Sequence, residues 1–433
     1  MNKVFRSFSI VSLTFLSAFH CTAQKTDAVF NVKEAERIEN FLASDEMRGR
    51  RTGSPEIEKA AAFIADEFKK AGLQPLQGSS YLQEFVMIRP RLKELKFKAE
   101  GADVDAKNIV VITTKPELEV DEKSGFEIRT ISAGSNLFAE VTKLNGEKKN
   151  LIVLIDTSFS KNFSRLTGLK RQMFQTPFSK IFLLANSLPK EFKIKADHTF
   201  DETRFANVVG VLPGKSKKAE QVIFSSHYDH IGVGKPVEGD SIYNGANDDA
   251  AGTTAVIMLA NHFKKLANNE RTLIFAAFTA EEVGGFGSQY FSQQFDPQQV
   301  IAMFNIEMIG TESKWGKNSA YITGFEKTNM GEMLQANLKG SAFQFYPDPY
   351  TTQNLFYRSD NATLARLGVP AHTISTAKME DEPNYHKPSD EVKTLDLENM
   401  TQIMKAVAES SKTIISGKDT PSRVKPESMN RSN

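Results

Sequence analysis

Histidine and carboxylate side chains follow the ends of four apolar, strand-like runs in this chain of 433 residues. The four runs read QVIFSS, TLIFAAFTA, IAMFNI and PAHTIS. The side chains that follow them are His227, Asp229, His230, Glu281, Glu282, Glu307 and His386. Because ligands of open α/β sheets bind outside the carboxyl ends of the strands, we expect these residues to line one crevice.

The segment NGANDDAAGTTAVIMLA places two adjacent aspartates, Asp248 and Asp249, directly before an apolar helix. One short polar side chain is enough to cap a helix, because its oxygen accepts from the first free backbone N–H groups. A capping turn with a spare solvated acid is the ordinary explanation of such a segment taken alone. Together with the strand-end residues, the pair indicates a metal site in which Asp248 bridges two cations while Asp249 and Asn247 hold the turn in shape.

Glu307 requires a positive partner, because its neighbours in AMFNIEMIG are apolar and predict burial. An unpaired buried carboxylate is costly, and this segment contains no lysine or arginine. Taken singly, His227 and His230 could be ordinary loop histidines, and Glu281-Glu282 could be a solvated strand end. As a set, two histidines with three or four carboxylates suit zinc, with cobalt or manganese as alternatives. Two ions about 3.5–4 Å apart that share one aspartate would form a hydrolytic site.

The surrounding segments predict the scaffold that positions these residues. Residues 33–73 contain two amphipathic helical stretches, and residues 85–200 contain short β-like runs separated by lysine-rich connections. After residue 205, continuous apolar strands alternate with helices, which is typical of a buried, mainly parallel sheet. The helices expected there cover residues 250–267, 286–295, 328–338, 360–367 and 396–416. We therefore predict an α/β fold, a three-layer sandwich with a mostly parallel central sheet flanked by helices, and an inserted β-rich accessory domain.

The amino-terminal sequence MNKVFRSFSIVSLTFLSAFHCTAQKTD is typical of an export signal, because Lys3 and Arg6 precede a short apolar run and CTA ends at Ala23. That run is too short to anchor the chain across a bilayer. We expect a signal peptide at residues 1–23 and delivery to the periplasm or the medium. The further predicted boundaries are 24–84 for the first part of the main domain, 85–200 for the insert, 201–416 for the rest of the main domain and 417–433 for a polar, disordered tail.

The composition excludes several classes of function. Lysine and arginine number 54 against 53 acidic residues, and no long basic run occurs, so we expect no nucleic acid partner. Cys21 is the only cysteine, and it lies in the predicted signal peptide. The mature chain would then contain no thiol, which excludes disulfides and cysteine nucleophiles and leaves nitrogen and oxygen atoms to bind any metal. The sequence does not define an oligomeric state.

An ordered set of motifs resembles a family of co-catalytic zinc peptidases, which includes secreted bacterial aminopeptidases, glutamate carboxypeptidase and the non-enzymatic transferrin receptor. In the family's order, the motifs read MRGRRTGSPEIEKAAAFIADEFKKAGLQP, NVVGVLPG, SSHYDHIG, NGANDDAAG, AAFTAEEVGGFGS, NIEMIG, RSDNATLARLGVPA and NYHKPSDEV. Each motif alone is weak, whereas the ordered set is specific. The resemblance covers most of the chain outside the insert, and the insert itself is only vaguely similar to a protease-associated domain.

This resemblance implies two zinc ions per chain and a role for each matching residue. His227 and Glu307 would hold one ion, and Glu282 and His386 would hold the other. Asp248 would bridge the two ions.

The same resemblance identifies the residues that act on the bound water. Glu281 would be the general base, which takes a proton from the water between the two ions and passes it to the leaving amine. Asp229 would orient the His227 imidazole. The peptide bond between Asp248 and Asp249 would be cis.

The chain departs from the family pattern at three positions. Glu307 stands where the family usually has aspartate, but glutamate is an equivalent oxygen ligand that is one methylene longer. Ala251 stands where serine is common, which is a minor change. Asn361 stands where relatives often have histidine, so the details of substrate binding there differ from the family pattern.

We predict an exported, zinc-dependent exopeptidase, in the first place an aminopeptidase whose substrate is a peptide with a free N-terminus. A carboxypeptidase or another amidohydrolase is the alternative enzyme, with Arg358 as a candidate for binding a substrate carboxylate unless it forms a surface salt bridge. A glutaminyl cyclase would use one zinc. The five ligand positions argue against this activity, because they suffice for two ions. A non-catalytic binding protein would have lost ligands or the base, whereas Glu281 and all five ligand positions hold competent residues.

Overall fold

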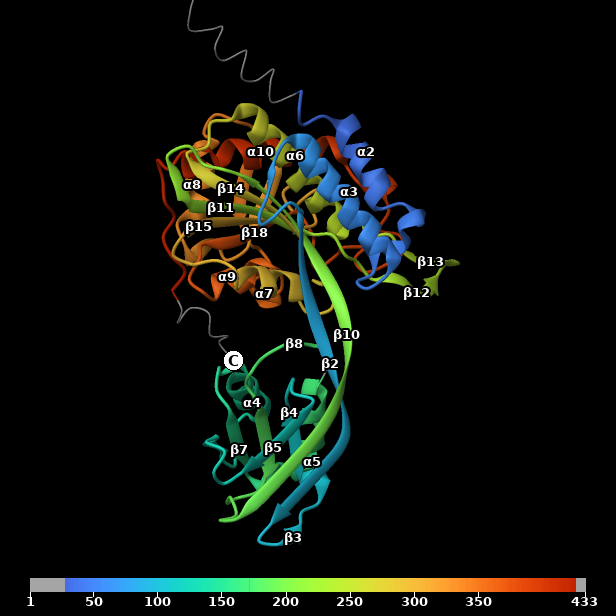
Figure 1. Cartoon of the computed structure of the whole chain (residues 1–433). Helices are drawn as coiled ribbons and strands as arrows, with labels where there is room; N and C mark the ends of the chain where they lie inside the picture. Colours follow the sequence, from blue (N-terminus) through green and yellow to red (C-terminus); the bar gives the residue numbers. More distant parts are fainter. Residues whose placement is uncertain (1–27, 171, 426–433) are drawn as a thin grey trace, which may run out of the picture. The chain divides into compact units, whose positions relative to one another are not determined.

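The computed structural model describes residues 28–170 and 172–425 of the chain (Figure 1). They form two compact units, with residues 28–84 and 205–425 in unit 1 and residues 85–204 in unit 2. The insert predicted at residues 85–200 falls within unit 2, and the predicted signal peptide lies outside the described residues. Among the residues that the structure describes, no helix is long and apolar enough to cross a membrane.

Unit 1 is built around a large sheet whose central strands are parallel. Its main strands are β10 Phe192–Leu212, β11 Lys217–His227, β14 Arg271–Phe278, β15 Val300–Ile306, β16 Ser319–Ile322, β17 Gln344–Pro347 and β18 Ala371–Ser375. Their order is β17-β16-β18-β15-β11-β14-β10. β11 pairs in parallel with both β14 and β15, and β15 pairs in parallel with β18. The β16–β18 and β10–β14 pairs are antiparallel.

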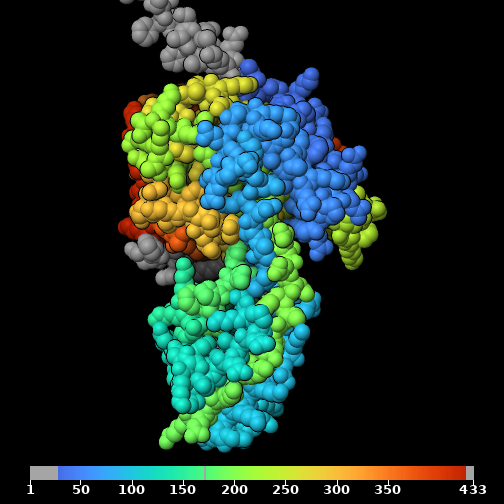
Figure 2. Space-filling view, in the orientation of Figure 1, coloured from blue at the N-terminus to red at the C-terminus, as the bar shows by residue number. Residues whose placement is uncertain are grey.

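Helices cover both faces of this sheet. The helices of unit 1 are α2 Val32–Leu42, α3 Pro55–Ala71, α6 Ala251–Leu266, α7 Phe286–Ser292, α8 Met330–Asn337, α9 Asn361–Ala365, α10 Leu397–Ser410 and α11 Lys412–Ile415. Buried residues of α2, α3, α6 and α10 pack on one face, and buried residues of α7 and α9 pack on the other (Figure 1). In Figure 2 the side chains of α2 and α3 (blue) form a continuous part of the unit 1 surface. The predicted α/β fold with a central sheet flanked by helices is therefore confirmed.

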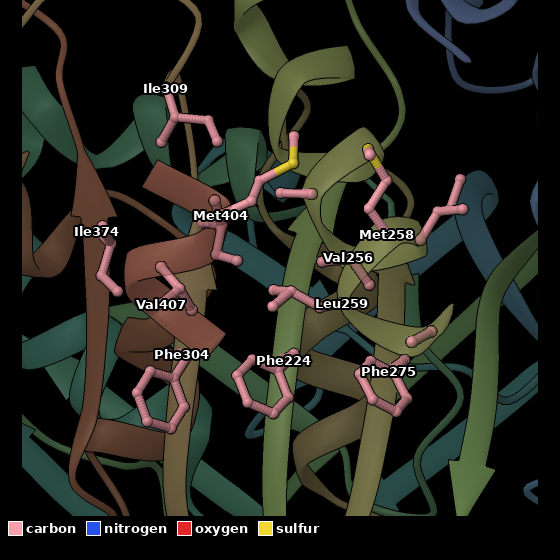
Figure 3. Close-up of a cluster of buried hydrophobic side chains, with 14 of the residues drawn as sticks. Phe224, Val256, Met258, Leu259, Phe275, Phe304, Ile309, Ile374, Met404 and Val407 are labelled. Atoms are coloured by element: carbon pink, nitrogen blue, oxygen red, sulfur yellow. The ribbon is translucent and has the colours of Figure 1, made fainter. Parts of the chain in front are cut away.

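A row of phenylalanines forms the centre of the core beneath α6 and α10 (Figure 3). Phe224, Phe275 and Phe304 occupy matching positions on β11, β14 and β15. The Phe224 ring lies 5.6 Å from the Phe275 ring and 4.9 Å from the Phe304 ring, centroid to centroid. The neighbouring residues on each strand point to the opposite face, as the twofold repeat of a strand requires. This packing holds the central strands in register and so aligns their carboxyl ends.

Unit 2 contains a sheet of its own with the order β4-β9-β7-β6. Its elements are β2 Leu82–Ala99 and β10, which unit 2 shares with unit 1, and β3 Ala102–Asp103, β4 Ile109–Ile112, β5 Glu117–Asp121, β6 Glu127–Ile131, α4 Leu137–Gly146, β7 Leu151–Ile155, α5 Ser160–Phe163, β8 Met173–Phe174 and β9 Lys180–Leu184. β7 is parallel to β6 and β9, whereas β4 is antiparallel to β9. Separate apolar clusters lie on the two faces of this sheet, so unit 2 has its own core.

The described part of the predicted disordered tail is packed on unit 1. Val424 is buried, and its N–H donates to the Gly368 carbonyl oxygen at 3.1 Å. The Arg423 guanidinium donates to the carbonyl oxygens of Val300 and Pro297 at 2.7 and 2.8 Å. Arg271 also donates to the Asp419 carbonyl oxygen at 2.7 Å and to the Thr420 hydroxyl at 2.6 Å. The polar composition of residues 417–425 gave no sign of this docking, because hydrogen bonds to distant segments hold most of it.

Arg50 ties the amino-terminal helices to the loops at the carboxyl end of β11. Its side chain is fully buried, and it donates to the carbonyl oxygens of Tyr228, Asn244 and Gly245 at 2.9, 2.6 and 2.8 Å. It also donates to the carbonyl oxygen of Leu42, the last residue of α2. One guanidinium therefore satisfies backbone acceptors from three separate segments.

Replacing Arg50 with alanine is expected to destabilise unit 1 by about 3–5 kcal/mol, because four buried carbonyl oxygens lose their donor. Urea unfolding followed by the fluorescence of Trp315, the only tryptophan of the chain, measures this in unit 1. As a control, Lys412→Ala removes half of an exposed ion pair with Glu409 and should change the free energy of unfolding by at most about 1 kcal/mol. Equal unfolding midpoints for the two variants would contradict a stabilising role of the buried Arg50 hydrogen bonds.

Candidate metal centre

Strands β14, β11, β15 and β18 are parallel neighbours, so their carboxyl ends lie along the same edge of the sheet. The predicted site residues at or beyond these strand ends are His227, Asp229, Glu281, Glu282, Glu307 and His386. The turn that contains Asp248 and Asp249 directly precedes α6 and lies at the same edge. The structure therefore brings together all the residues that the sequence singled out.

The first group of candidate ligands consists of His227, Asp248 and Glu307, whose donor atoms all lie within 4.8 Å of one another. His227 Nε2 lies 3.2 Å from Asp248 Oδ1. The other ring nitrogen, Nδ1, donates to the Asp229 carbonyl oxygen at 3.1 Å, so neutral His227 carries its proton there. Nε2 is buried and has no hydrogen-bond partner among the described residues. Its lone pair is thus available to a cation.

The second group contains His230, Asp248 and Glu282, whose donor atoms also lie within 4.8 Å of one another. His386 joins this group, because its Nε2 lies 3.2 Å from Asp248 Oδ2 and 3.3 Å from Glu282 Oε2. Hydrogen bonds to these two carboxylates raise the pKa of His386 to about 10. Asp248 takes part in both groups, facing His227 through Oδ1 and His386 through Oδ2. Asp248 could therefore be shared by cations held in the two groups.

The residues expected to hold the Asp248 turn do so through main-chain donors. The Asp249 carboxylate accepts from the N–H groups of His227, Gly252 and Met308 at 3.2, 3.0 and 3.0 Å. It thereby joins β11, α6 and the residues after β15. Asn247 Oδ1 accepts from the Gly310 N–H at 2.8 Å. The peptide bond between Asp248 and Asp249 is cis, as the resemblance implies.

Asp390 is a supporting residue that the sequence did not reveal. Its two carboxylate oxygens accept from the backbone N–H groups of Asn247 and Asp248 at 2.8 and 3.0 Å. Burial raises the pKa of Asp390 to about 6, although these backbone hydrogen bonds lower it. No sequence pattern marks this role, because Asp390 lies about 140 positions from the turn that it holds.

Asp229 supports the site differently from the expected role. The ring of His227 is hydrogen-bonded by the main-chain oxygen of Asp229, whereas the Asp229 carboxylate lies 3.8 Å from Nδ1. That carboxylate is occupied by other donors, the Glu281 N–H at 3.1 Å and the Thr52 hydroxyl at 2.9 Å. Asp229 thus positions both His227, through its backbone, and the turn that contains Glu281, through its side chain.

Burial raises the pKa values of two carboxyl groups of the site, those of Glu281 and Glu307. It raises the pKa of Glu281 well above the usual range, an effect that the His227 charge opposes and the Glu307 charge reinforces. Burial also raises the pKa of Glu307, against the His227 charge and a hydrogen bond from the Ser359 hydroxyl. Cations bound among these groups would favour their ionised forms.

The donor set fits divalent cations that prefer nitrogen and oxygen ligands, such as zinc. Three donor atoms that point into the site are buried and have no hydrogen-bond partner in the described part of the chain; they are His227 Nε2, His230 Nδ1 and Glu282 Oε1. Buried polar atoms are rarely left unpaired, because the loss of water is then not offset. Bound cations would satisfy all three atoms.

A cavity opens beside the two groups. Both groups contribute to its lining through Asp248, Glu282, Glu307 and His386, and Glu281 also lines it. Its other walls combine apolar or aromatic residues, namely Met308, Tyr321, Leu355, Ala377, Met379 and Tyr385, with the hydroxyl-bearing residues Thr323, Ser359, Thr373 and Ser375. The exposed Arg358, which the sequence marked as a candidate carboxylate-binding residue, lines the same cavity.

Comparison with known families and sequences gives consistent matches. Residues 207–411 match the family model described as peptidase family M28. A probable leucine aminopeptidase of Trichophyton verrucosum is 29% identical over 205 residues, which cover 45% of this chain and 54% of that protein. Aminopeptidase YwaD of Bacillus subtilis is 21% identical over 338 residues, covering 76% of this chain and 68% of that protein. The chain spans about half the length of the fungal relatives that it matches.

Solved structures share the fold. An aminopeptidase from Aneurinibacillus sp. strain AM-1 has a TM-score of 0.53 at 19% identity and covers 90% of this chain and 95% of its own. BSAP, a zinc aminopeptidase from Bacillus subtilis, has a TM-score of 0.53 at 17% identity and covers 90% of this chain and 97% of its own. At these identities the likeness concerns the fold, and it agrees with the family match.

Replacing Asp390 with asparagine is expected to weaken metal binding about 10–100-fold, because an amide can accept only one of the two backbone N–H groups that hold the turn. Competition with a chromophoric chelator measures the affinity. Asp296→Asn is the matched control, since its carboxylate also accepts a backbone N–H, from Gln298, on an exposed loop. Unchanged affinity in Asp390→Asn would show that the turn does not depend on this carboxylate.

Proposed function

Residues 207–411 belong to peptidase family M28, and on that premise we propose that the protein is an exported zinc-dependent exopeptidase, an aminopeptidase that releases N-terminal residues. The observation that carries the proposal is the position of Asp248, whose two oxygens face two separate groups of candidate ligands. The named relatives are leucine aminopeptidases, which supports action at the amino end of a peptide.

Two zinc ions would be held by the residues that the motifs indicate. One position is formed by His227 and Glu307, the other by Glu282 and His386, and Asp248 belongs to both. When bound, the ions supply Lewis acidity, which polarises a substrate carbonyl group and lowers the pKa of water.

Glu281 is the residue placed to move protons in this site. It lines the cavity together with the candidate ligands, and its backbone N–H is fixed by the Asp229 carboxylate. Burial raises its pKa well above the ordinary value, which suits a group that must accept a proton and then release it. In the proposed reaction Glu281 takes a proton from the attacking water and delivers it to the departing amine.

The cavity supports a substrate with an apolar N-terminal residue. Met308, Leu355, Ala377 and Met379 contribute apolar wall, and Glu281 and Glu282 line the same cavity. A free α-amine carries a positive charge, which the carboxylates Glu281 and Glu282 would attract. The proposed substrate is therefore a peptide with an unblocked amino end.

A carboxypeptidase is the second candidate, and one observation favours it. Arg358 is exposed and lines the same cavity, where its guanidinium could bind a substrate carboxylate. The two candidates require different free ends on the substrate, so blocked substrates distinguish them.

Export remains part of the proposal and is supported by the amino-terminal sequence alone. Lys3 and Arg6 precede an apolar run that ends in CTA at Ala23. N-terminal sequencing of the protein recovered from the periplasm or the medium, with Gln24 as the expected first residue, tests it.

Glu281→Gln is expected to lower kcat about 10²–10⁴-fold while the protein keeps two zinc ions per chain, because glutamine cannot accept the proton. Zinc content and turnover are measured on the same preparation. Glu326→Gln, at an exposed position, is the control that should retain full activity. Full activity of Glu281→Gln would exclude it as the base, and activity that survives exhaustive chelation would exclude the metal mechanism.

Leucyl-p-nitroanilide should be cleaved at least about 100-fold faster than its N-acetylated form, because acetylation removes the charged amine that the acidic site attracts. An N-acetylated dipeptide with a free carboxylate provides the opposite test. Cleavage of that dipeptide alone would favour the carboxypeptidase and contradict the aminopeptidase.

A further inference from the structure

His230 belongs by distance to the second group of candidate ligands, but the family motifs assign it no role. Its side chain is buried, and its backbone N–H donates to the Arg50 carbonyl oxygen at 3.3 Å. The ring rests directly on Gly245, where an added Cβ would come within 2.5 and 2.6 Å of the ring atoms Cγ and Cδ2. The lack of a side chain at Gly245 therefore lets the imidazole reach the Asp248 turn.

We propose that His230 is a further protein ligand of the metal ion assigned to Asp248, Glu282 and His386, an inference that rests on the proposed two-metal function. This ion would then have two imidazoles among its ligands. The ion assigned to His227, Asp248 and Glu307 would have one, so the two metal positions are chemically unequal.

The first argument comes from two unpaired atoms. His230 Nδ1 and Glu282 Oε1 lie 2.8 Å apart, yet both are buried and neither forms a hydrogen bond with any described residue. At this distance the two atoms can share a proton or bind one cation as neighbouring donors, and the lack of a well-aligned hydrogen bond favours the cation. In the first group His227 Nε2, which lies 3.2 Å from Asp248 Oδ1, is likewise buried and unpaired.

The second argument comes from the spacing of the donor atoms. Zinc binds histidine nitrogen and carboxylate oxygen at about 2.0–2.2 Å, so neighbouring donors on a tetrahedron lie about 3.4 Å apart. His386 Nε2 lies 3.2 Å from Asp248 Oδ2 and 3.3 Å from Glu282 Oε2. His230 Nδ1 lies 2.8 Å from Glu282 Oε1 and 3.9 Å from Asp248 Oδ2. These distances fall on both sides of the tetrahedral value, so the four donors lie close enough to share one cation, and zinc can take a water as a fifth ligand.

The third argument comes from the two imidazole rings. The centroids of His230 and His386 are 5.7 Å apart, and the ring planes are inclined by 72°. Two imidazoles that bind one zinc through nitrogens about 2.0–2.1 Å from it have centroids roughly 5–6 Å apart, so this separation is compatible with a shared ion. The two histidines also differ in support, because His230 is fully enclosed beyond the end of β11, whereas the His386 side chain is 37% exposed. His230 thus supplies the rigid imidazole of the pair.

The test counts the imidazoles bound by the protein when it is loaded with two zinc ions. The mature, metal-free chain receives two equivalents of zinc, and X-ray absorption fine structure reports the average number of histidine ligands. We expect three imidazoles for the two zinc ions in the wild-type protein and two in both His230→Ala and His230→Phe, of which the latter keeps a ring of similar size. Chelator competition should show a loss of about 100-fold or more in the affinity for one of the two zinc ions, beyond the usual effect of an outer hydrogen-bond partner.

His262→Ala is the matched control, since His262 is a buried histidine that packs against Phe30 and Phe263 outside the site. It should keep the wild-type imidazole count. Circular dichroism and Trp315 fluorescence verify that each variant is folded.

A total of two imidazoles for two zinc ions in the wild-type protein would overturn the inference without any variant. An unchanged count in folded His230→Phe would also overturn it, and would leave His230 as a hydrogen-bond partner of Glu282. In both cases zinc binding and peptidase activity would persist, so the proposed function would stand. A wild-type chain that binds no zinc would overturn the inference and the proposed function together.

Discussion

The shared carboxylate of Asp248 constrains the structure around it, because its two oxygens must face opposite groups of ligands at once. Oδ1 faces His227 and Oδ2 faces His386. Because the Asp248 carboxylate faces both histidines, it cannot move toward one without moving away from the other. Its backbone is accordingly held from outside the turn, by the two oxygens of Asp390. The neighbouring Asp249 uses its own carboxylate entirely for backbone N–H groups.

The sheet supplies the rigidity that this arrangement needs. Four parallel strands end at one edge, and the stacked phenylalanines at Phe224, Phe275 and Phe304 keep the inner three in register. Residues at strand ends have little freedom to move when the strands beneath them are close-packed. Arg50 adds a second restraint, because it connects the end of α2 to the loops after β11 and before α6. The site is therefore positioned by main-chain contacts from several segments.

The electrostatics of the site explain why cations belong to it. Burial raises the pKa values of Asp249, Glu281 and Glu307, so without cations these carboxyl groups resist ionisation. The match of residues 207–411 to the model of peptidase family M28 and the clustered, unpaired donor atoms point to the same divalent ions. In the proposed peptidase, the acidic groups of the site have two roles. They would hold the metal ions and attract the positively charged amino end of a substrate.

Much of the fold could be predicted, because it depends on local patterns. Apolar runs and amphipathic spacing predicted the helices and the central strands of unit 1 with boundaries close to the observed ones, as for α6 and α9, but did not predict the edge strand β17. Strand-end position was enough to select His227, Glu282, Glu307 and other site residues, since parallel strands present their carboxyl ends at one edge. The family motifs added the cis bond before Asp249.

Contacts between segments far apart in the chain could not be predicted from the sequence. Nothing local indicates that Asp390 holds the Asp248 turn, that the Asp229 carboxylate turns to Thr52 and Glu281, or that residues 417–425 dock on unit 1. The sequence by itself determined which residue types stand at the strand ends, because spacing along one chain sets strands and helices. Only the tertiary structure decided which atoms of those residues meet, such as His230 and Glu282, because those distances depend on how separate elements pack.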